Sequence, residues 1–339
     1  MKNFRRFGRL APSFGATALL SLGLVSTAPQ FTPAANAVTP SCADATTSAP
    51  TGPATLSATS TPYGKVLVEG AGDHAGCSLY ALSSDRLRAL SGADFACSDN
   101  HNVLFDVLNT QAPCDTFLWP ALLTNGRPIA GPGVNPSLLG TVTRSDLSLG
   151  DNDLGTVQQV TYAGLPLYRF LFDEDPGEME GANLFDPVTS PTGIWYLVDP
   201  NRGAPATGQA RLQSETIGEQ TVVSVTMNDH FSVFPEASFP VYTSSADSGH
   251  TSVCQAECAA VDWPPVLTSG RPEAGSGVDQ HSLGTIVRSD GTHQVTLNGK
   301  PLYLHDSDAY IGGVTGTQGI TGDGANTAWG VFHTIPTSP

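Results

Sequence analysis

One stretch of the chain occurs twice. Leu123–Asp146 (LTNGRPIAGPGVNPSLLGTVTRSD) and Leu267–Asp290 (LTSGRPEAGSGVDQHSLGTIVRSD) begin 144 positions apart (267 − 123) and are identical at 15 of 24 positions. Gly, Pro, Arg and Asp recur at fixed places in both copies, which indicates duplication of one supersecondary unit rather than a shared periodicity. A chain of 339 residues is long enough to bury two cores. We therefore predict two homologous domains in tandem.

A shorter motif, Tyr-x-x-x-x-Asp, occurs four times. Its copies are Tyr80 with Asp85, Tyr168 with Asp173, Tyr242 with Asp247, and Tyr303 with Asp308. Two copies in each domain indicate that each domain is itself built from two similar halves. An Asp five residues after the Tyr falls just past the end of a short strand, where a carboxylate accepts turn N–H groups. We expect the Tyr to pack in the core and the Asp to fix the turn; a ligand or cation site is the alternative.

The local patterns are those of short strands separated by glycine-rich turns. The clearest hairpin signal is Gln294–Leu297 and Lys300–Tyr303 around Asn298-Gly299, because Asn-Gly readily supplies the positive φ angles of a type I′ turn. Gln159–Tyr168 matches it in the first domain. Helical periodicity of useful length is absent, and only short helical turns are expected near Pro136–Leu139 and Ser252–Ala260. The predicted fold is all-β and mostly antiparallel, with short helical turns.

The start of the chain has the pattern of a cleavable signal peptide. Basic residues between Lys2 and Arg9 precede an apolar run at 16–25, and Ala35-Asn36-Ala37 follows. We expect export by the Sec route, and Arg5-Arg6 leaves the twin-arginine route open. The first cysteine, Cys42, does not follow a lipobox, so we expect a secreted protein without a lipid anchor.

Composition places the remaining boundaries. Residues 38–54 are mostly small, polar or Pro, which is typical of a flexible leader, and residues 201–217 are rich in Pro, Gly and Gln, which is typical of a linker. The first domain is longer because it carries insertions. The predicted order is a signal peptide at 1–37, the leader at 38–54, a first domain at 55–200, the linker at 201–217 and a second domain at 218–335.

The charge of the mature chain limits its partners. Residues 1–37 hold four of the 15 basic residues and no acidic one, so the mature net charge is 11 − 31 = −20 with His neutral. Such a surface repels nucleic acid and anionic lipid. No stretch beyond the signal peptide approaches the roughly 20 apolar residues that span a bilayer. The partner is unknown from the sequence, with cell-envelope components as candidates.

Six cysteines follow the predicted cleavage site, and export favours disulfides over free thiols. Cys254 and Cys258 are the only cysteines of the second domain and most simply bond to each other. In the first domain Cys97 is the nearest candidate partner for Cys114, and Cys42 with Cys77 then follows by elimination. The sequence alone leaves this first-domain connectivity open.

A further signature joins a cysteine pair to a tryptophan. It reads Cys254-x-x-x-Cys258-x-x-x-x-Trp263-Pro264-Pro265 and is partly echoed by Cys114-x-x-x-x-Trp119-Pro120. The spacing is not a common zinc spacing, and a local disulfide that fixes a Trp-Pro corner explains it. A redox-active pair is the alternative, although the Cys-x-x-Cys spacing is missing.

With these motifs the chain resembles the actinobacterial "secreted repeat of unknown function" family, which is also described as predicted lipoproteins with a Tyr-x-(Phe/Trp/Tyr)-x-x-Asp motif. The resemblance covers roughly 55–200 and 218–335. Only Tyr168-Arg169-Phe170 has the aromatic residue that this motif expects, and the lipobox is missing. The resemblance implies a tandem secreted module whose biochemical role is unsettled.

Candidate catalytic residues do not form a recognisable set. The eight histidines show no His-x-x-His pair, and neither a nucleophile elbow nor a phosphate loop is present. Acidic loops at 151–153 and 173–180 lack EF-hand spacing, and we interpret them as solvated loops. We predict a secreted, non-enzymatic protein with no catalytic residues, metal or cofactor, and with a binding or structural role. The alternatives are an exported redox or metal-handling protein that uses the Tyr/Asp/His305 surface and, as a second alternative, a hydrolase.

Overall fold

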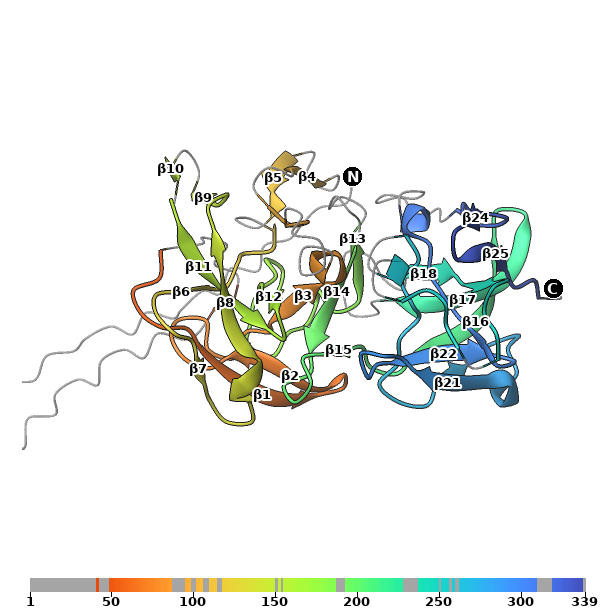
Figure 1. Ribbon diagram of the computed structural model, residues 1–339, viewed down its shortest axis with the longest axis horizontal. Coiled ribbons are helices and arrows are strands. Elements are labelled where there is room, and N and C mark those ends of the chain that lie inside the picture. The colour runs from red at the N-terminus through yellow and green to blue at the C-terminus, as the bar shows by residue number, and fades with distance from the viewer. Residues whose placement is uncertain are drawn as a thin grey trace, which may run out of the picture. The chain divides into compact units, whose positions relative to one another are not determined.

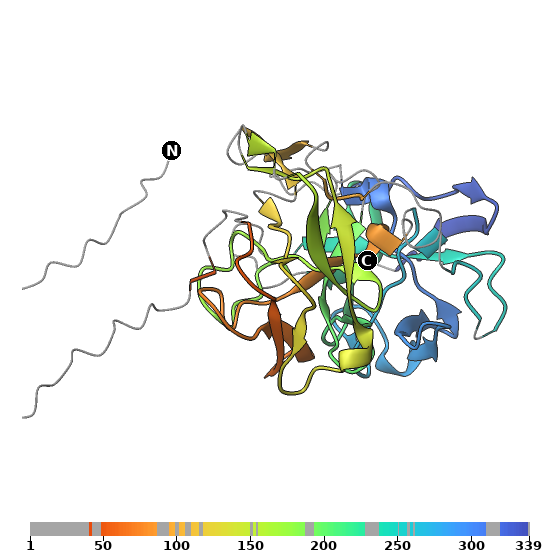
Figure 2. The same ribbon diagram turned by 60° about the vertical axis from the view of Figure 1, so that its left-hand side comes forward.

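The computed structural model describes residues 41–42, 49–86, 95–98, 102–105, 110–114, 118–149, 152–153, 155–186, 193–227, 237–249, 251–255, 258–259, 262–309 and 319–337. The predicted signal peptide lies outside these residues. Figures 1 and 2 show the described strands from orange at the start of the chain to blue near its end.

The secondary structure is mostly β, and most strand pairs are antiparallel. The strands are β1 (Thr55–Thr61), β2 (Gly64–Glu69), β3 (Tyr80–Leu82), β4 (Asn102–Phe105), β5 (Thr110–Pro113), β6 (Leu123–Thr124), β7 (Ile129–Ala130), β8 (Leu139–Arg144), β9 (Ser148–Leu149), β10 (Asn152–Asp153), β11 (Val157–Tyr162), β12 (Leu165–Pro166), β13 (Leu184–Asp186), β14 (Gly193–Val198), β15 (Pro205–Ala206), β16 (Arg211–Ile217), β17 (Gln220–Met227), β18 (Ala237–Pro240), β19 (Tyr242–Ser244), β20 (Glu273–Ala274), β21 (Leu283–Val287), β22 (His293–Leu297), β23 (Lys300–Pro301), β24 (Asn326–Thr327) and β25 (Gly330–Thr334).

The helical elements are single turns, as the sequence predicts. The 3-10 turns are η1 (Ser83–Asp85), η3 (Pro136–Leu138), η4 (Gln280–Ser282) and η5 (Asp306–Ala309). The η3 and η4 turns are capped by the side chains of Asn135 and Asp279, which accept the N–H of the second helical residue. Of the turn expected at Ser252–Ala260, the described residues show helix at 258–259.

The first set of strands is organised around β1, β11 and β14. β1 pairs antiparallel with β2 and parallel with β7. β11 pairs antiparallel with β6, β8 and β12. β14 pairs antiparallel with β3, β13 and β15.

The later strands pair in a corresponding order. β16 pairs antiparallel with β17 and parallel with β20, and β17 also pairs with β18. β22 pairs antiparallel with β21 and β23, while β25 pairs antiparallel with β19 and β24. The parallel registers correspond as well, because Leu56 lies opposite Ala130 and Leu212 opposite Ala274.

The two hairpins that the sequence indicates have two-residue turns with positive φ. Asn298 and Gly299 have φ angles of 50° and 78°, and they connect β22 to β23. Ala163 and Gly164 have φ angles of 50° and 83°, and they connect β11 to β12. Positive φ at both central residues is the conformation that joins two antiparallel strands without opposing their twist.

Strand β14 is buried along its whole length. Its side chains point alternately to opposite faces and pack into different apolar clusters, with Val198 at its end in a third one. Trp195 and Leu197 belong to a cluster with Trp119. Ile194 and Tyr196 belong instead to a cluster with Leu212 and other residues of the later strands. The strand therefore has no face left for solvent.

Two predicted connecting segments carry structure. Residues 201–217 include β15 and the long strand β16, so the segment expected to be a linker contributes strands. Its sequence RLQSETI alternates, and Leu212 and Ile217 are buried, but the preceding Pro and Gly residues obscure this pattern. In the segment expected to be a flexible leader, Cys42 is buried and disulfide-bonded to Cys77.

None of the helices among the described residues is both long and apolar enough to cross a membrane.

Replacing Gly322 by Ala should destabilise the fold. A Cβ atom there would lie 2.7 Å from Cη2 of Trp263 and 2.9 Å from Cγ of His305. Overpacking of this kind lowers the free energy of unfolding by about 1–3 kcal/mol. Urea unfolding measures the loss, and Gly270→Ala is the matched control because nothing lies within 4 Å of a Cβ at that position. Equal stability of the two variants would contradict the packing described here.

Candidate functional site

The four motif tyrosines form two backbone pairs. The N–H of Tyr80 donates to the carbonyl of Tyr168 and the N–H of Tyr168 donates to that of Tyr80, both at 2.9 Å. Tyr242 and Tyr303 exchange the same two hydrogen bonds, also at 2.9 Å. All four side chains are fully buried. The two motif copies of each half of the chain therefore meet at their tyrosines, in an isolated antiparallel bridge.

The hydroxyl groups cross over between the paired copies. Tyr80 donates to Oδ2 of Asp173 at 2.7 Å, and Tyr168 donates to Oδ2 of Asp85 at 2.8 Å. Each tyrosine is therefore bound to the aspartate of the other copy and not to the one five residues further on. The reciprocal pattern ties the two copies together through side chains as well as backbone.

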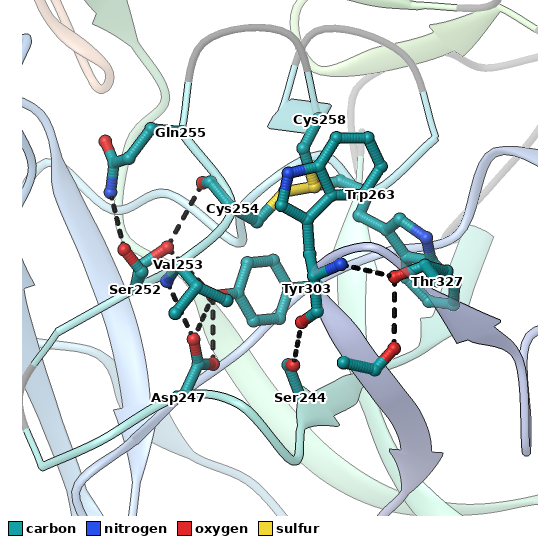
Figure 3. Close-up of a disulfide and its surroundings, with 12 residues drawn as sticks. Ser244, Asp247, Ser252, Val253, Cys254, Gln255, Cys258, Trp263, Tyr303 and Thr327 are labelled. Carbon is teal, nitrogen blue, oxygen red and sulfur yellow. Dashed lines mark hydrogen bonds between the residues drawn. A yellow bond between two sulfur atoms is a disulfide. The ribbon is translucent and has the colours of Figure 1, made fainter.

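The same crossing occurs in the later half of the chain. Tyr242 donates to Oδ2 of Asp308 at 2.6 Å, and Tyr303 lies 2.9 Å from Oδ2 of Asp247. The Tyr303 hydroxyl also lies within hydrogen-bonding distance of the Ser252 hydroxyl, with 2.8 Å between the two oxygens. Figure 3 shows this hydroxyl between the Asp247 carboxylate and Ser252.

The other oxygen of each aspartate holds a returning loop. Oδ1 of Asp85 accepts the N–H of Ala96, and Oδ1 of Asp173 accepts the N–H of Glu180. Oδ1 of Asp247 and Oδ1 of Asp308 do the same for residues 253 and 321, in hydrogen bonds of 2.8 Å. Each carboxylate therefore joins a tyrosine hydroxyl to the N–H of a loop further along the chain.

A tryptophan lies against each tyrosine pair. Trp119 stacks between Phe170 and Trp195, with ring centroids 4.2 and 3.8 Å away. It also meets the Tyr80 ring edge-on at 5.4 Å. The core around the first pair of carboxylates is thus made of aromatic rings, which exclude water.

In the second network a histidine takes one of these positions. Trp263 stacks on Phe332 at 3.7 Å and on His305 at 4.4 Å. His305 lies where Phe170 lies in the first network, two residues after the motif tyrosine. Its Nδ1 is 2.9 Å from Oγ1 of Thr321, a residue that also donates to Asp308. The imidazole is therefore part of the packing around Trp263.

Buried arginines connect the duplicated stretch to the disulfides. Arg144 is fully buried and donates to the Gln159 side chain, to the carbonyl of Cys97 and to Asp146. The Asp146 carboxylate lies 2.6 Å from its guanidinium, so the buried charge is paired.

Arg288 makes the corresponding contacts. It donates to the Gln294 side chain at 2.6 Å and to the carbonyl of Cys254 at 2.9 Å. Gln159 and Gln294 in turn donate to the carbonyls of Leu167 and Leu302 in the facing hairpin strand. These two glutamines belong to neither the Tyr-x-x-x-x-Asp motif nor the cysteine–tryptophan signature. Their corresponding places at the start of the two matching hairpin sequences were the signal that could have found them.

Three disulfides are present: Cys42–Cys77, Cys97–Cys114 and Cys254–Cys258. The two later ones adjoin the tryptophans, because the N–H of Trp119 donates to the carbonyl of Cys114 and that of Trp263 to Cys258. Figure 3 shows the Cys254–Cys258 bond beside Trp263. Each of these disulfides therefore fixes the loop that delivers a tryptophan to a tyrosine pair.

Burial dominates the electrostatics of the carboxylates. Desolvation raises the pKa of Asp85 to about 6 and that of Asp173 to about 8, although the Tyr168 and Tyr80 hydroxyls oppose the shift. Burial also raises the pKa of Asp247. Glu69 lies 3.8 Å from the Arg169 guanidinium, and burial raises the pKa of its carboxyl to about 7 against the effect of that charge.

Other residues considered from the sequence lie apart from these networks. His281 is exposed and contacts Asp279, so it faces no closed pocket. In the acidic loop after Asp173, the Glu178 carboxylate accepts the N–H groups of Glu174 and Asp175 and closes the loop. Among the described residues, no group of three or more His, Cys, Asp or Glu side chains is placed to hold a metal ion.

Removing a single motif hydroxyl should weaken the fold. Tyr80→Phe leaves Oδ2 of the buried Asp173 without its donor, which lowers the free energy of unfolding by about 1–3 kcal/mol. In a double-mutant cycle with Asp173→Asn, the coupling energy should be non-zero, whereas Tyr80→Phe with Asp85→Asn should show less coupling. Stronger coupling of Tyr80 to Asp85 in urea unfolding would overturn the crossed arrangement.

Stability should fall as pH rises from about 4 to about 8. The carboxyls of Asp85, Glu69 and Asp173 have pKa values raised above those of the unfolded chain, so the folded state keeps protons that the unfolded state has lost. The pKa of Asp173 is the highest of the three, about 8, so between pH ~5 and ~7 this residue should account for a slope approaching about 1.4 kcal/mol per pH unit, which declines above pH ~7. Asp173→Asn should remove that part of the slope. The exposed Glu174→Gln is the control, and an unchanged slope in Asp173→Asn would contradict the shift.

Comparison with known proteins gives one match. Two stretches of the chain, residues 148–186 and 284–333, match the family model described as a secreted repeat of unknown function. The first stretch contains Tyr168 and Asp173, and the second contains Tyr303 and Asp308. No curated protein and no solved structure matches the chain. Over these two stretches the chain is therefore similar to a family described as secreted, and its three disulfides fit an extracellular protein.

Proposed function

We propose that this chain is a non-enzymatic protein of the cell envelope or the extracellular space, with a binding or structural role. One observation carries the proposal: the polar atoms of the repeated motif are used inside the fold. Each tyrosine hydroxyl donates to an aspartate, and each aspartate also holds a loop N–H. A catalytic carboxylate needs access to a substrate, whereas these carboxylates are in contact with the protein itself.

The tandem organisation is part of the proposal. Two domains, at 55–200 and 218–335, would each consist of two halves joined by a crossed Tyr–Asp pair. The corresponding strand pairings, of β1 with β2 and β7 and of β16 with β17 and β20, support two domains, and the pairing of β16 extends the second one back to Arg211. The Arg–Gln contacts of Arg144 and Arg288 also support two domains.

Export is also part of the proposal. A signal peptide at 1–37 would be removed after Sec transport, leaving a soluble chain without a lipid anchor in which Cys42 lies near the N terminus. The Cys42–Cys77 disulfide supports an oxidising destination. Because Cys42 is used in a disulfide, it is not available for lipid attachment.

Protein recovered from the culture medium after expression of the full chain tests this function. We expect its N terminus at Val38, less than stoichiometric metal by elemental analysis, and no thiol that reacts before unfolding. After denaturation with a reductant, six thiols should titrate. The Cys254–Cys258 bond should resist mild reductant in the folded protein, because both residues are buried and a thiolate cannot reach the sulfurs.

The same measurements separate the alternatives. Stoichiometric copper, iron or haem would support a metal-handling protein. Selective reduction of Cys254–Cys258 under native conditions would support a redox role. Either result would overturn the non-enzymatic proposal, whereas retention in the cell with residues 1–37 attached would overturn only the export step.

A further inference from the structure

A cavity of about 290 Å³ is lined by two distant parts of the chain. One part comprises the end of β3, the β11–β12 turn and β14, and the other comprises segments near Cys254 and the end of the second duplicated stretch. Apolar side chains such as Leu165, Pro205 and Leu267 make up much of its wall. Cavities with a mostly apolar wall and a few polar groups are the usual form of small-molecule sites.

Tyr196 supplies one of the polar groups. It projects from β14 on the face opposite to Trp195, and only 6% of it is exposed. It lines the cavity, and no hydrogen bond to its hydroxyl is found among the described residues. Burial raises the pKa of this hydroxyl, while the nearby charges of Arg288 and Arg86 oppose the shift. The side chain is thus largely buried while its hydroxyl remains able to donate to a ligand in the cavity.

Two guanidinium groups line the same cavity. Arg288 is held in place by Gln294 and by the carbonyl of Cys254. Arg86 follows η1 and is half-buried, and the described part of the chain shows no hydrogen bond or ion pair of its side chain. Asp290 is the acidic residue of the wall, and its carboxylate already accepts from the N–H and the hydroxyl of Thr292.

The charge of the cavity is opposite to that of the chain. The protein has 31 acidic and 15 basic residues, yet Arg86 and Arg288 outnumber Asp290 on this wall. A planar guanidinium binds a carboxylate with two parallel hydrogen bonds, and a tyrosine hydroxyl adds a third donor. The nearby Asp290 carboxylate disfavours a ligand of higher negative charge.

We propose that this cavity binds a small monocarboxylate with an apolar body, whose carboxylate contacts Arg86 and the Tyr196 hydroxyl. The apolar body packs on Leu165, Pro205 and Leu267. The proposal rests on the binding role proposed above and gives it a ligand class. Its failure would leave the metal, thiol and N-terminus results unchanged, so the two proposals are tested separately.

Octanoate is the probe, titrated into the full mature chain by calorimetry and by ¹H–¹⁵N correlation spectra. We expect saturable binding at millimolar concentration or below, with shifts concentrated at residues of the cavity wall. Octanol tests the need for the carboxylate and octylammonium tests the sign of the charge, and both should bind at least about tenfold more weakly because they lose the charged hydrogen bonds.

Two variants test the named contacts. Arg86→Gln and Tyr196→Phe should each weaken octanoate binding, by about tenfold for Arg86→Gln. Arg127→Gln is the control, because it removes the same charge from an exposed arginine outside the cavity and should leave affinity unchanged. Urea unfolding of each variant confirms that it is folded.

Four results would overturn the proposal, and three of them concern how octanoate binds. They are equal affinity for octanol and octanoate, unchanged octanoate binding in folded Arg86→Gln, and shifts that map away from the cavity in the wild-type spectra. The absence of any octanoate binding at millimolar concentration would overturn it as well. The spectra of the wild-type protein keep the test decisive even where a variant fails to fold.

Discussion

A buried carboxylate is tolerated only where its oxygens accept hydrogen bonds, and the fold depends on meeting this condition at its motif aspartates. Asp85 and Asp173 are buried and bind tyrosines of an aromatic cluster. Each receives one donor from a tyrosine of the other motif copy and one from a loop N–H. Neither motif copy can therefore complete its hydrogen bonds alone. The pairing of halves follows from this mutual requirement as much as from apolar packing.

Buried polar groups also hold the disulfide loops in place, through two arginines. Arg144 and Arg288 each bring a positive charge into the interior. Each guanidinium donates to the side chain of a glutamine and to the carbonyl of a disulfide-bonded cysteine. The loops that these two disulfides close differ in length, because the sequence separation is 17 for Cys97–Cys114 and 4 for Cys254–Cys258. The contact to arginine is nonetheless the same, so Cys97 corresponds in space to Cys254. Counting along the repeat assigns that position to Thr110 instead, because the insertion lies inside the disulfide loop.

The features that the sequence predicts correctly are those that depend on residues close together in the chain. The β class and the Asn298-Gly299 turn depend on neighbouring residues, whose conformations are limited by short-range sterics. Which aspartate binds which tyrosine is a long-range choice, and a five-residue spacing repeated four times is compatible with either partner. β16 was missed for a related reason: its pairing with β17 and β20 stabilises it, while its flanking residues favour a linker. The apolar wall of the cavity likewise comes from segments that only the tertiary fold brings together.

Strand β14 has a consequence for how such a chain could evolve. One face of the strand packs with Trp119, and the other, through Ile194 and Tyr196, packs with residues of the later strands. If the second face of such a strand were polar, the strands that follow it could be lost without exposing apolar surface. The Ile194 and Tyr196 face of β14 is instead covered by apolar residues of the later strands. A chain that lost those later strands would expose this apolar surface, which would favour aggregation.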